Sequence, residues 1–297
     1  MKKFYFVIYS TLSIILISHV YSTNSWSTIW DVDNNGKWSL PDIIYGFQSL
    51  VGMKSSNFET VVFSDNNFEA AIRDALSKPV GDIFVSDMLS LTSLDASGRN
   101  IKNIEGIRHA INLSHLTLEH KETNGSWNYN AINDISEVSR LTKLSVLYMS
   151  YNQISDISAV AGLTNLTALH LISNQISDIS PLSGLTKLTS LHLGLNSISD
   201  ISSLSGLTKL SDLNLVYNQI SDISALTGLI NLNRIVIWSN QIYSIKPLVD
   251  NSGINSGDYI GLTFLEYGVG NPLNTTSCTD YIPQLQDRGV RIDHSCQ

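Results

Sequence analysis

Leucine and isoleucine positions recur every 22 residues along the middle of this chain. Four consecutive segments begin at Leu144, Leu166, Leu188 and Leu210, and they read LSVLYMSYNQISDISAVAGLTN, LTALHLISNQISDISPLSGLTK, LTSLHLGLNSISDISSLSGLTK and LSDLNLVYNQISDISALTGLIN. Each follows the apolar pattern LxxLxLxxNxI, with one methionine in place of a leucine. A unit of this length cannot bury its apolar face alone and does so only by stacking on its neighbours. The pattern therefore predicts a solenoid.

The alternation of side chains within each copy predicts one short β-strand. In LTALHLISNQIS, Leu169 and Leu171 alternate with more variable residues, so a period of two directs the leucines into the core and the other side chains to an open face. An asparagine follows where the strand must turn, and its amide can satisfy backbone groups that the bend leaves unpaired. These asparagines are Asn130, Asn152, Asn174, Asn196, Asn218 and Asn240.

The repeats extend over residues 91–262 as seven coils. The coils begin at Leu91, Leu113, Leu144, Leu166, Leu188, Leu210 and Leu232. The first coil is degenerate, with Arg99 where the others carry asparagine. The second is longer by nine residues, because KETNGSWNY at 121–129 interrupts it. We expect this insertion to leave the sheet edge as a loop, which either contacts a ligand or is neutral variation in length.

Both ends of the array have the features of caps. Residues 57–90 contain a helical pattern with its N-cap at Asp65 or Asn66, and this helix can cover the apolar face of the first coil. Residues 263–297 are expected to form a C-terminal cap that follows a last, degenerate coil. This cap should contain a short helix around residues 281–288 and a final strand through residues 290–292.

Coils of 22 residues that carry NQISDISPLSGLT are similar to internalin-type leucine-rich repeats, and the resemblance spans about residues 60–295. It implies an α/β repeat fold: a right-handed leucine-rich-repeat solenoid with a concave parallel β-sheet and convex 3₁₀ segments. It also implies an extracellular protein that holds protein ligands and does not catalyse a reaction. The chain has no GxSxG or HExxH pattern and no glycine-rich phosphate loop, so an enzyme is not expected.

The first 22 residues, MKKFYFVIYSTLSIILISHVYS, have the form of a cleaved secretory signal. Two lysines precede an apolar run from Phe4 to Val20, which polar residues interrupt. The alternative is an uncleaved membrane anchor, because the run is slightly long for a signal. No later segment is apolar enough to span a bilayer. We therefore expect a secreted or cell-envelope protein without stable membrane insertion after cleavage.

The net charge limits the classes of binding partner that we expect, and the cysteines indicate the compartment in which the protein resides. The formal net charge is −8, and loss of Lys2 and Lys3 with the signal makes the mature chain more acidic, which disfavours nucleic acid and anionic membranes. The two cysteines, Cys278 and Cys296, would reach an oxidising compartment, so a disulfide that closes this end is expected. A metal site formed by the cysteines and His294 would lack ligands.

The segment 23–56 contains a candidate calcium loop. Its oxygen-bearing side chains have the spacing of a 12-residue EF-hand loop, with a glycine at the sharp turn. The candidate ligands are Asp31, Asp33, Asn35, the backbone carbonyl of Lys37, and Asp42. The segment resembles one half of a dockerin, although a dockerin has two such loops and an EF-hand has glutamate at the last position. We expect bound Ca²⁺, with a metal-free turn rich in Asp and Asn as the alternative.

The outward positions of the strands vary between coils while the core positions stay constant, as in a surface adapted to a ligand. The candidate ligand-binding residues are Tyr148, Tyr151, His170, Ile172, His192, Leu195, Tyr217 and Trp238. Without the two histidines, and together with Val216, they are expected to form an exposed apolar and aromatic area, because tyrosine and tryptophan often anchor protein interfaces. The alternative is that Leu195 and Val216 only shield the sheet.

His170 and His192 should neighbour each other across two coils, but a metal site would need a third ligand. We expect ordinary polar residues of the face, with a mild pH dependence of binding. The sequence thus predicts an exported, non-enzymatic protein whose partner is an extracellular or cell-surface protein. Glycan binding, through tyrosine and tryptophan stacked on sugars, and a structural role in the envelope are the alternatives.

Overall fold

The structure of the protein is a computed structural model, which describes residues 59–264, 269–294 and 296. The chain divides into two units, Met1–Glu59 and Thr60–Gln297, and every element below belongs to the second. The signal sequence, the segment 23–56 and its calcium loop lie outside the described residues. The cleaved signal and the bound calcium ion therefore stay predictions.

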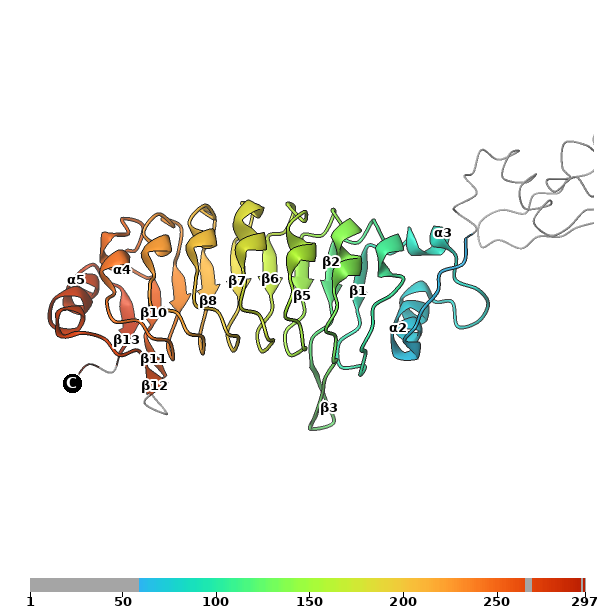
Figure 1. Ribbon diagram of the computed structural model, residues 1–297, viewed down its shortest axis with the longest axis horizontal. Coiled ribbons are helices and arrows are strands. Elements are labelled where there is room, and N and C mark those ends of the chain that lie inside the picture. The colour runs from blue at the N-terminus through green and yellow to red at the C-terminus, as the bar shows by residue number, and fades with distance from the viewer. Residues whose placement is uncertain (1–58, 265–268, 295, 297) are drawn as a thin grey trace, which may run out of the picture. The chain divides into compact units, whose positions relative to one another are not determined.

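Short strands of the described chain form one nine-stranded parallel sheet, in which each strand pairs with the next coil's strand (Figure 1). The strands are β1 Ser93–Asp95, β2 His115–Thr117, β5 Val146–Tyr148, β6 Ala168–His170, β7 Ser190–His192, β8 Asp212–Asn214, β9 Arg234–Val236, β10 Tyr259–Gly261 and β13 Arg291–Asp293. Equivalent residues lie opposite each other, as Leu147 does Leu169. The expected fold class, a leucine-rich-repeat solenoid, is confirmed.

A short helical turn follows the strand of each regular coil and continues the stack (Figure 1). The 3₁₀ segments are η2 Ile107–His109, η3 Ser136–Arg140, η4 Ser158–Val160, η5 Ser180–Gly184, η6 Ser202–Leu204 and η7 Ser224–Leu226, and the α-helix α4 Lys246–Asp250 takes their place in the seventh coil. The aspartate of each SDIS motif organises this turn: the Ser158 backbone N–H donates to Asp156 Oδ1 at 2.7 Å. This hydrogen bond lowers the pKa of Asp156.

One hydrophobic core runs through the described array. The leucine and isoleucine positions of the repeats, such as Leu169, Ile176 and Leu185, are fully buried. The helix α2 (Asn66–Leu76) and the single turn α3 (Val85–Met88) extend this core over the first coil with apolar side chains of their own. Burial of this apolar surface is the main stabilising term, because no coil has an apolar interior of its own.

Asp65 joins the N-terminal helix to the first coil. Its Oδ1 accepts the backbone N–H groups of Asn67 at 2.9 Å and Phe68 at 3.1 Å, which caps α2. Its Oδ2 accepts the backbone N–H of Lys102 at 2.7 Å. Burial alone would raise the pKa of Asp65, but these backbone hydrogen bonds lower it. A single carboxylate therefore both starts the helix and holds it on the array.

The asparagines form a ladder that joins successive coils. Asn174 Nδ2 donates to the carbonyls of Met149 and Leu171, both at 3.1 Å, and its Oδ1 accepts the Ile154 backbone N–H at 2.9 Å. The same pattern repeats at Asn152, Asn196, Asn218 and Asn240. The prediction that these amides satisfy the bent backbone is confirmed, and each amide also bridges to the preceding coil.

Asn271 continues the asparagine ladder although it lies outside the 22-residue period. Its Nδ2 donates to the Ile237 carbonyl at 3.0 Å, and its Oδ1 accepts the Asn240 backbone N–H at 3.2 Å. It follows a small hairpin formed by β11 (Thr263–Phe264) and β12 (Val269–Gly270). The sequence did not indicate this role, because the last coil is longer than the others.

A second ladder consists of serine and threonine hydroxyls just before the strands. The Thr167 hydroxyl donates to the Ser145 carbonyl at 3.0 Å, and the Thr189 hydroxyl donates to the Thr167 carbonyl at 3.0 Å. Ser114, Ser145 and Ser211 make the equivalent bonds. These bonds fix the spacing of the coils at the start of the strands, whereas the asparagines do so beyond the end of the strands.

The C-terminal part closes the array with one irregular coil. It contributes β10, then the π-helical turn η8 (Ser277–Tyr281), the helix α5 (Ile282–Asp287) and the last strand β13, which pairs with β10 in parallel. A disulfide joins Cys278 to Cys296, with the Cα atoms 5.5 Å apart. The expected pairing of the two cysteines is therefore present in the structure.

Candidate binding surface

Register across the sheet places the second outward side chain of each strand in one column. Tyr148 pairs with His170, and His170 pairs with His192. The ring centroids of Tyr148 and His170 are 4.1 Å apart with an interplanar angle of 11°. Those of His170 and His192 are 4.0 Å apart with an angle of 7°. Tyr148, His170 and His192 therefore form one continuous pile of rings, which we call the central stack.

Hydrogen bonds anchor the central stack at its C-terminal end. His170 Nε2 lies 3.1 Å from Ser190 Oγ, and His192 Nε2 lies 3.0 Å from Asp212 Oδ2. The other carboxylate oxygen of Asp212 accepts from Arg234 Nη1 at 3.1 Å. Burial alone would raise the pKa of Asp212, but hydrogen bonds from His192 and Arg234 lower it. The imidazole of His192 thus has a fixed orientation beside a carboxylate.

The central stack keeps His170 neutral. Burial between two rings, and then the neighbouring His192, lower its pKa to about 4, although Asp212 acts in the opposite direction. Near neutral pH the middle ring of the stack, His170, is therefore uncharged. Parallel stacking of two imidazoles at this distance is not a geometry in which both can ligate one metal ion. Among the described residues, no group of three or more His, Cys, Asp or Glu side chains is arranged to hold a metal ion.

The residues just before the asparagines of successive coils adopt a left-handed backbone. We call them the edge row: Tyr151, Ser173, Leu195, Tyr217 and Ser239, with φ between 50° and 60°. This conformation costs a non-glycine residue roughly 1 kcal/mol, so the turn geometry of the coil must impose it. It leaves Leu195 41% and Tyr217 39% exposed. The edge row therefore carries the more exposed of the predicted binding residues.

The structure separates the predicted binding residues into smaller groups. Tyr217 and Trp238 form an edge-to-face pair with centroids 4.6 Å apart. Tyr151 packs on the ring of His120 at 4.1 Å. Ile172 is half-buried, two residues beyond His170 on its own coil. The surface is thus a set of aromatic groups, of which the central stack lies on the strands and the rest lie toward the turns that follow them.

Val216 does not belong to the exposed area, so that expectation was wrong. Its side chain is only 7% exposed. The physical reason is the neighbouring coil, where Gly194 has no side chain: a Cβ at that position would lie 2.7 Å from Val216 Cγ2 and 3.0 Å from Asn214 Oδ1. Val216 therefore fills the space that the glycine leaves. Shielding of the sheet, the alternative interpretation, applies to Val216 and not to the exposed Leu195.

The insertion at 121–129 forms a β-hairpin rather than an irregular loop. Its strands are β3 (Lys121–Thr123) and β4 (Ser126–Asn128), which pair antiparallel and project from the stack (Figure 1). The turn residues Asn124 and Gly125 both have positive φ, at 53° and 76°. Asn-Gly is the preferred dipeptide of this two-residue turn, because both positions require a left-handed conformation. That dipeptide was the sequence signal that would have predicted the hairpin.

The hairpin adds aromatic residues that were absent from the predicted site. His120 lies 4.8 Å from Trp127 and 6.0 Å from Tyr129, measured between ring centroids. Tyr151 of the following coil completes the group, and we call these four residues the hairpin cluster. Trp127 is 53% and Tyr129 47% exposed. Exposed rings held by other rings are typical of interface residues, because little side-chain entropy remains to be lost on binding.

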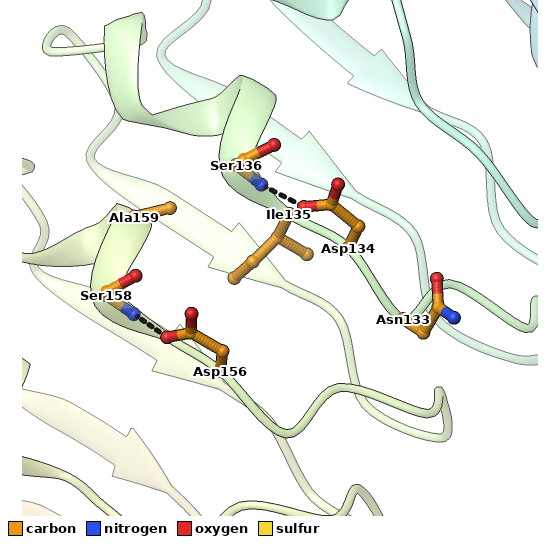
Figure 2. Close-up of a pocket in the computed structure, with 7 residues that line it drawn as sticks. All are labelled: Asn133, Asp134, Ile135, Ser136, Asp156, Ser158 and Ala159. Carbon is orange, nitrogen blue, oxygen red and sulfur yellow. Dashed lines mark hydrogen bonds between the residues drawn. The ribbon is translucent and has the colours of Figure 1, made fainter.

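A small groove lies between the turns of two successive coils, away from the strands. It has a volume of about 250 Å³ and is lined by Asn133, Asp134, Ile135, Ser136, Asp156, Ser158 and Ala159 (Figure 2). Figure 2 shows both aspartates turned toward the serine N–H groups of their own coils. These carboxylates therefore serve the repeat geometry.

Comparison with known families identifies leucine-rich repeats in the sequence itself. The family described as "Leucine Rich repeats (2 copies)" matches residues 164–206, which span the fourth coil and most of the fifth. Comparison with curated proteins gives no match.

Solved structures extend this likeness to the array. Internalin C2 from Listeria monocytogenes is 29% identical, and the alignment covers 78% of this chain and 95% of that chain with a TM-score of 0.65. An internalin (InlF) from the same organism is 30% identical over 79% of this chain and 72% of that chain, with a TM-score of 0.58. This chain belongs to the internalin-type leucine-rich-repeat proteins. A leucine-rich-repeat protein of Leptospira interrogans, 21% identical over 71% of this chain and 50% of that chain with a TM-score of 0.54, shares the fold alone.

Membership in the internalin type fits the surface described above. An internalin-like solenoid supports a protein-binding role, and in this internalin-type chain the aromatic groups lie on the strands and the turns that follow them. Among the residues that the structure describes, no helix has the length and apolar character of a membrane span.

Proposed function

We propose that this internalin-type protein is exported and binds an extracellular or cell-surface protein through the open face of its sheet. The central stack is the observation that carries the proposal. Three rings from three coils lie nearly parallel at 4.0–4.1 Å and are partly exposed, on a scaffold whose buried positions scarcely vary. Preordered aromatic rings lose little entropy on binding and so make effective anchors. Trp238 and Tyr217 extend the same surface toward the C-terminal coils.

A capture experiment tests the open face. Tagged mature protein is used to capture partners from its native surroundings, and the captured protein is then titrated as a purified component. Replacement of Tyr148 and Trp238 by alanine should weaken this binding at least about tenfold, as expected for interface anchors. Lys209→Ala is the matched control, because this exposed side chain follows the 3₁₀ turn η6. Equal affinity of the double variant and the wild type would contradict the proposal.

Glycan binding is the second candidate, and the exposed rings of the edge row and the hairpin cluster favour it. Aromatic faces can stack on the apolar faces of sugar rings as they stack on other rings. A glycan array separates the two candidates. Specific glycan signals that the Tyr151→Ala and Trp238→Ala changes abolish, without any protein captured, would replace the protein-binding proposal.

Export rests on the signal-like segment 1–22, and the disulfide is consistent with an oxidising compartment. The mass of the protein recovered from the medium or the envelope tests it. Cleavage after Ser22 is expected, and a full-length chain in that fraction would show that the segment is an anchor instead.

Calcium binding at residues 31–42 is a separate proposal that rests on the spacing of Asp31, Asp33, Asn35 and Asp42 and the carbonyl of Lys37. Titration calorimetry of the metal-free protein with Ca²⁺ tests it. The wild type should release heat with one site per chain, and Asp31→Ala should abolish that heat. Equal heats from the two proteins would end the calcium proposal without affecting the proposed open face.

A further inference from the structure

The two faces of the β3–β4 hairpin differ in what they contact. On one face Lys121 reaches back to the first coil, where its Nζ lies 3.5 Å from Asp95 Oδ2 and its Cβ fills the space beside Gly98. The other face follows from the register, since residues directly opposite in an antiparallel pair share a face. Glu122 lies opposite Trp127, so both point toward the side of the third coil, where Tyr151 packs.

The hairpin belongs to the second coil and is fixed to the coils on either side of it, the first and the third. Lys121 holds it on the first coil, and His120 packs against Tyr151 of the third coil with ring centroids 4.1 Å apart. Trp127 and Tyr129 in turn pack on His120 from the hairpin side. Aromatic contacts of this kind add about 0.5–1.5 kcal/mol each beyond the burial of area. About half of the Trp127 and Tyr129 surfaces nevertheless faces solvent in this fixed arrangement.

A carboxylate without a partner stands beside these rings. Glu122 is exposed and has neither an ion pair nor a side-chain hydrogen bond among the residues that the structure describes. Its Cβ lies about 5 Å from that of Trp127, the usual separation across an antiparallel pair. The nearest cation along the chain, Lys121, points to the opposite face and is engaged by Asp95. The face therefore combines preordered aromatic rings with one uncompensated negative charge.

We propose that this face of the hairpin binds an arginine side chain of the protein partner. A guanidinium stacks on an aromatic face and pairs with a carboxylate at the same time, which an ammonium on a flexible stem does less well. The net charge of −8 favours association with a basic segment over an acidic one. This inference deepens the proposed function, on which it rests for the partner, by stating the chemistry of one group that the partner presents.

A small probe tests the site without the partner. The full-length protein with ¹⁵N-labelled tryptophan is titrated with acetyl-Gly-Arg-Gly-amide, and with the same peptide carrying citrulline, which has the shape of arginine without its charge. The indole N–H signal of Trp127, assigned with Trp127→Phe, should shift in a saturable manner with the arginine peptide. The citrulline peptide should bind at least about threefold more weakly, as expected for loss of a cation–π contact and an exposed ion pair.

Charge variants make the test specific. Glu122→Gln should weaken binding of the arginine peptide about two- to fivefold. Asp287→Asn, which removes an equal charge from the exposed surface of α5, should leave the affinity unchanged. Equal shifts with arginine and citrulline, equal effects of the two charge variants, or no shift at Trp127 would each overturn the inference.

The proposed function fails in a distinguishable way. Trp238→Ala lies on another coil and should not alter the peptide titration, whatever it does to capture of the protein partner. Loss of partner binding in Trp238→Ala with an intact peptide titration supports both proposals. An intact peptide titration with no effect of open-face variants on the partner supports the hairpin site and contradicts the open face.

Discussion

His170 illustrates how the environment of one side chain couples binding surface to stability. Its pKa is about 4 in the folded protein, against 6.5 for an ordinary histidine, because its neighbours in the central stack exclude water and include another imidazole. Between these two pH values the unfolded chain binds a proton that the folded chain does not. The contribution of His170 to the free energy of unfolding is therefore fully present above about pH 6.5, and it is lost as the pH falls toward 4.

The expected pH dependence can be measured by urea unfolding of the wild type and His170→Gln at several pH values between 7 and 4. The wild type should lose more stability over this interval than the variant, because only the wild type has the histidine whose pKa is lowered. Ionisable groups remote from His170 contribute equally to both proteins. Parallel curves for the two proteins would show that the central stack does not resist protonation.

The asparagine ladder gives a second prediction for single residues. Asn218 Nδ2 donates to the carbonyls of Leu193 and Leu215, and its Oδ1 accepts the Ile198 backbone N–H at 3.0 Å. Asn218→Ala leaves these buried groups without partners and should lower the free energy of unfolding by roughly 3 kcal/mol. Gln219→Ala, at the exposed neighbouring position, should change it by less than about 0.5 kcal/mol. Thermal or urea unfolding provides the measurement, and similar losses in both would contradict the ladder's role.

Single residues were predictable from the sequence where the repeat fixes them. The buried leucines and the ladder asparagines recur at a constant spacing. Every regular coil has the same backbone path, so the same positions must be apolar or must hydrogen-bond the bent backbone. Val216 was not predictable in this way, because its burial depends on a glycine in the neighbouring coil. Asn271 was missed because its role depends on a position in space that no longer follows the period.

Among the elements, the caps and strands follow from local patterns, and the hairpin was predicted only as an insertion. The N-cap at Asp65 and the helix α5 arise from residues close in sequence. The hairpin also has a local signal in Asn124-Gly125, but its aromatic partner Tyr151 comes from the next coil. The hairpin cluster therefore required the three-dimensional arrangement, whereas the hairpin itself did not.

The disulfide should stabilise the C-terminal elements specifically. Cys278 and Cys296 are 18 residues apart, and closing a loop of this length restricts the unfolded chain by about 3 kcal/mol in the chain-entropy description. In a solenoid each coil contacts chiefly its neighbours, so loss of the disulfide acts mainly on the elements that it encloses. Replacement of both cysteines by serine should therefore destabilise α5 and β13 without a comparable effect on β6 and β7.

Amide hydrogen exchange of the double serine variant measures this effect. Exchange should become faster in Ile282–Asp287 and Arg291–Asp293 and stay near the wild-type rate in Ala168–His170 and Ser190–His192. A uniform increase across all strands would mean that the array unfolds as a single unit. Unchanged exchange in the C-terminal elements would mean that the disulfide contributes nothing to their stability.

For the molecule as a whole, the repeat separates structural positions from surface positions. Leucines, asparagines and the SDIS aspartates of the described coils are occupied by the core, the ladder and the turns. The outward positions of β5 to β9, the edge row and the residues between them are free of these structural roles. There the chain places the central stack, Leu195 and the Tyr217–Trp238 pair. The fold follows from the period, whereas the identity of the partner depends on positions that the period leaves free.

Hydroxyl-radical footprinting of the protein, alone and bound to its captured partner, tests the central claim most directly. This method reports solvent access of individual aromatic side chains, and the chain offers both candidates and an internal control. Oxidation of Tyr148, Tyr217 and Trp238 should fall in the complex, whereas that of Tyr243, 64% exposed and outside the proposed surface, should not change. Protection of Tyr243 with unchanged oxidation of the other three would contradict the account.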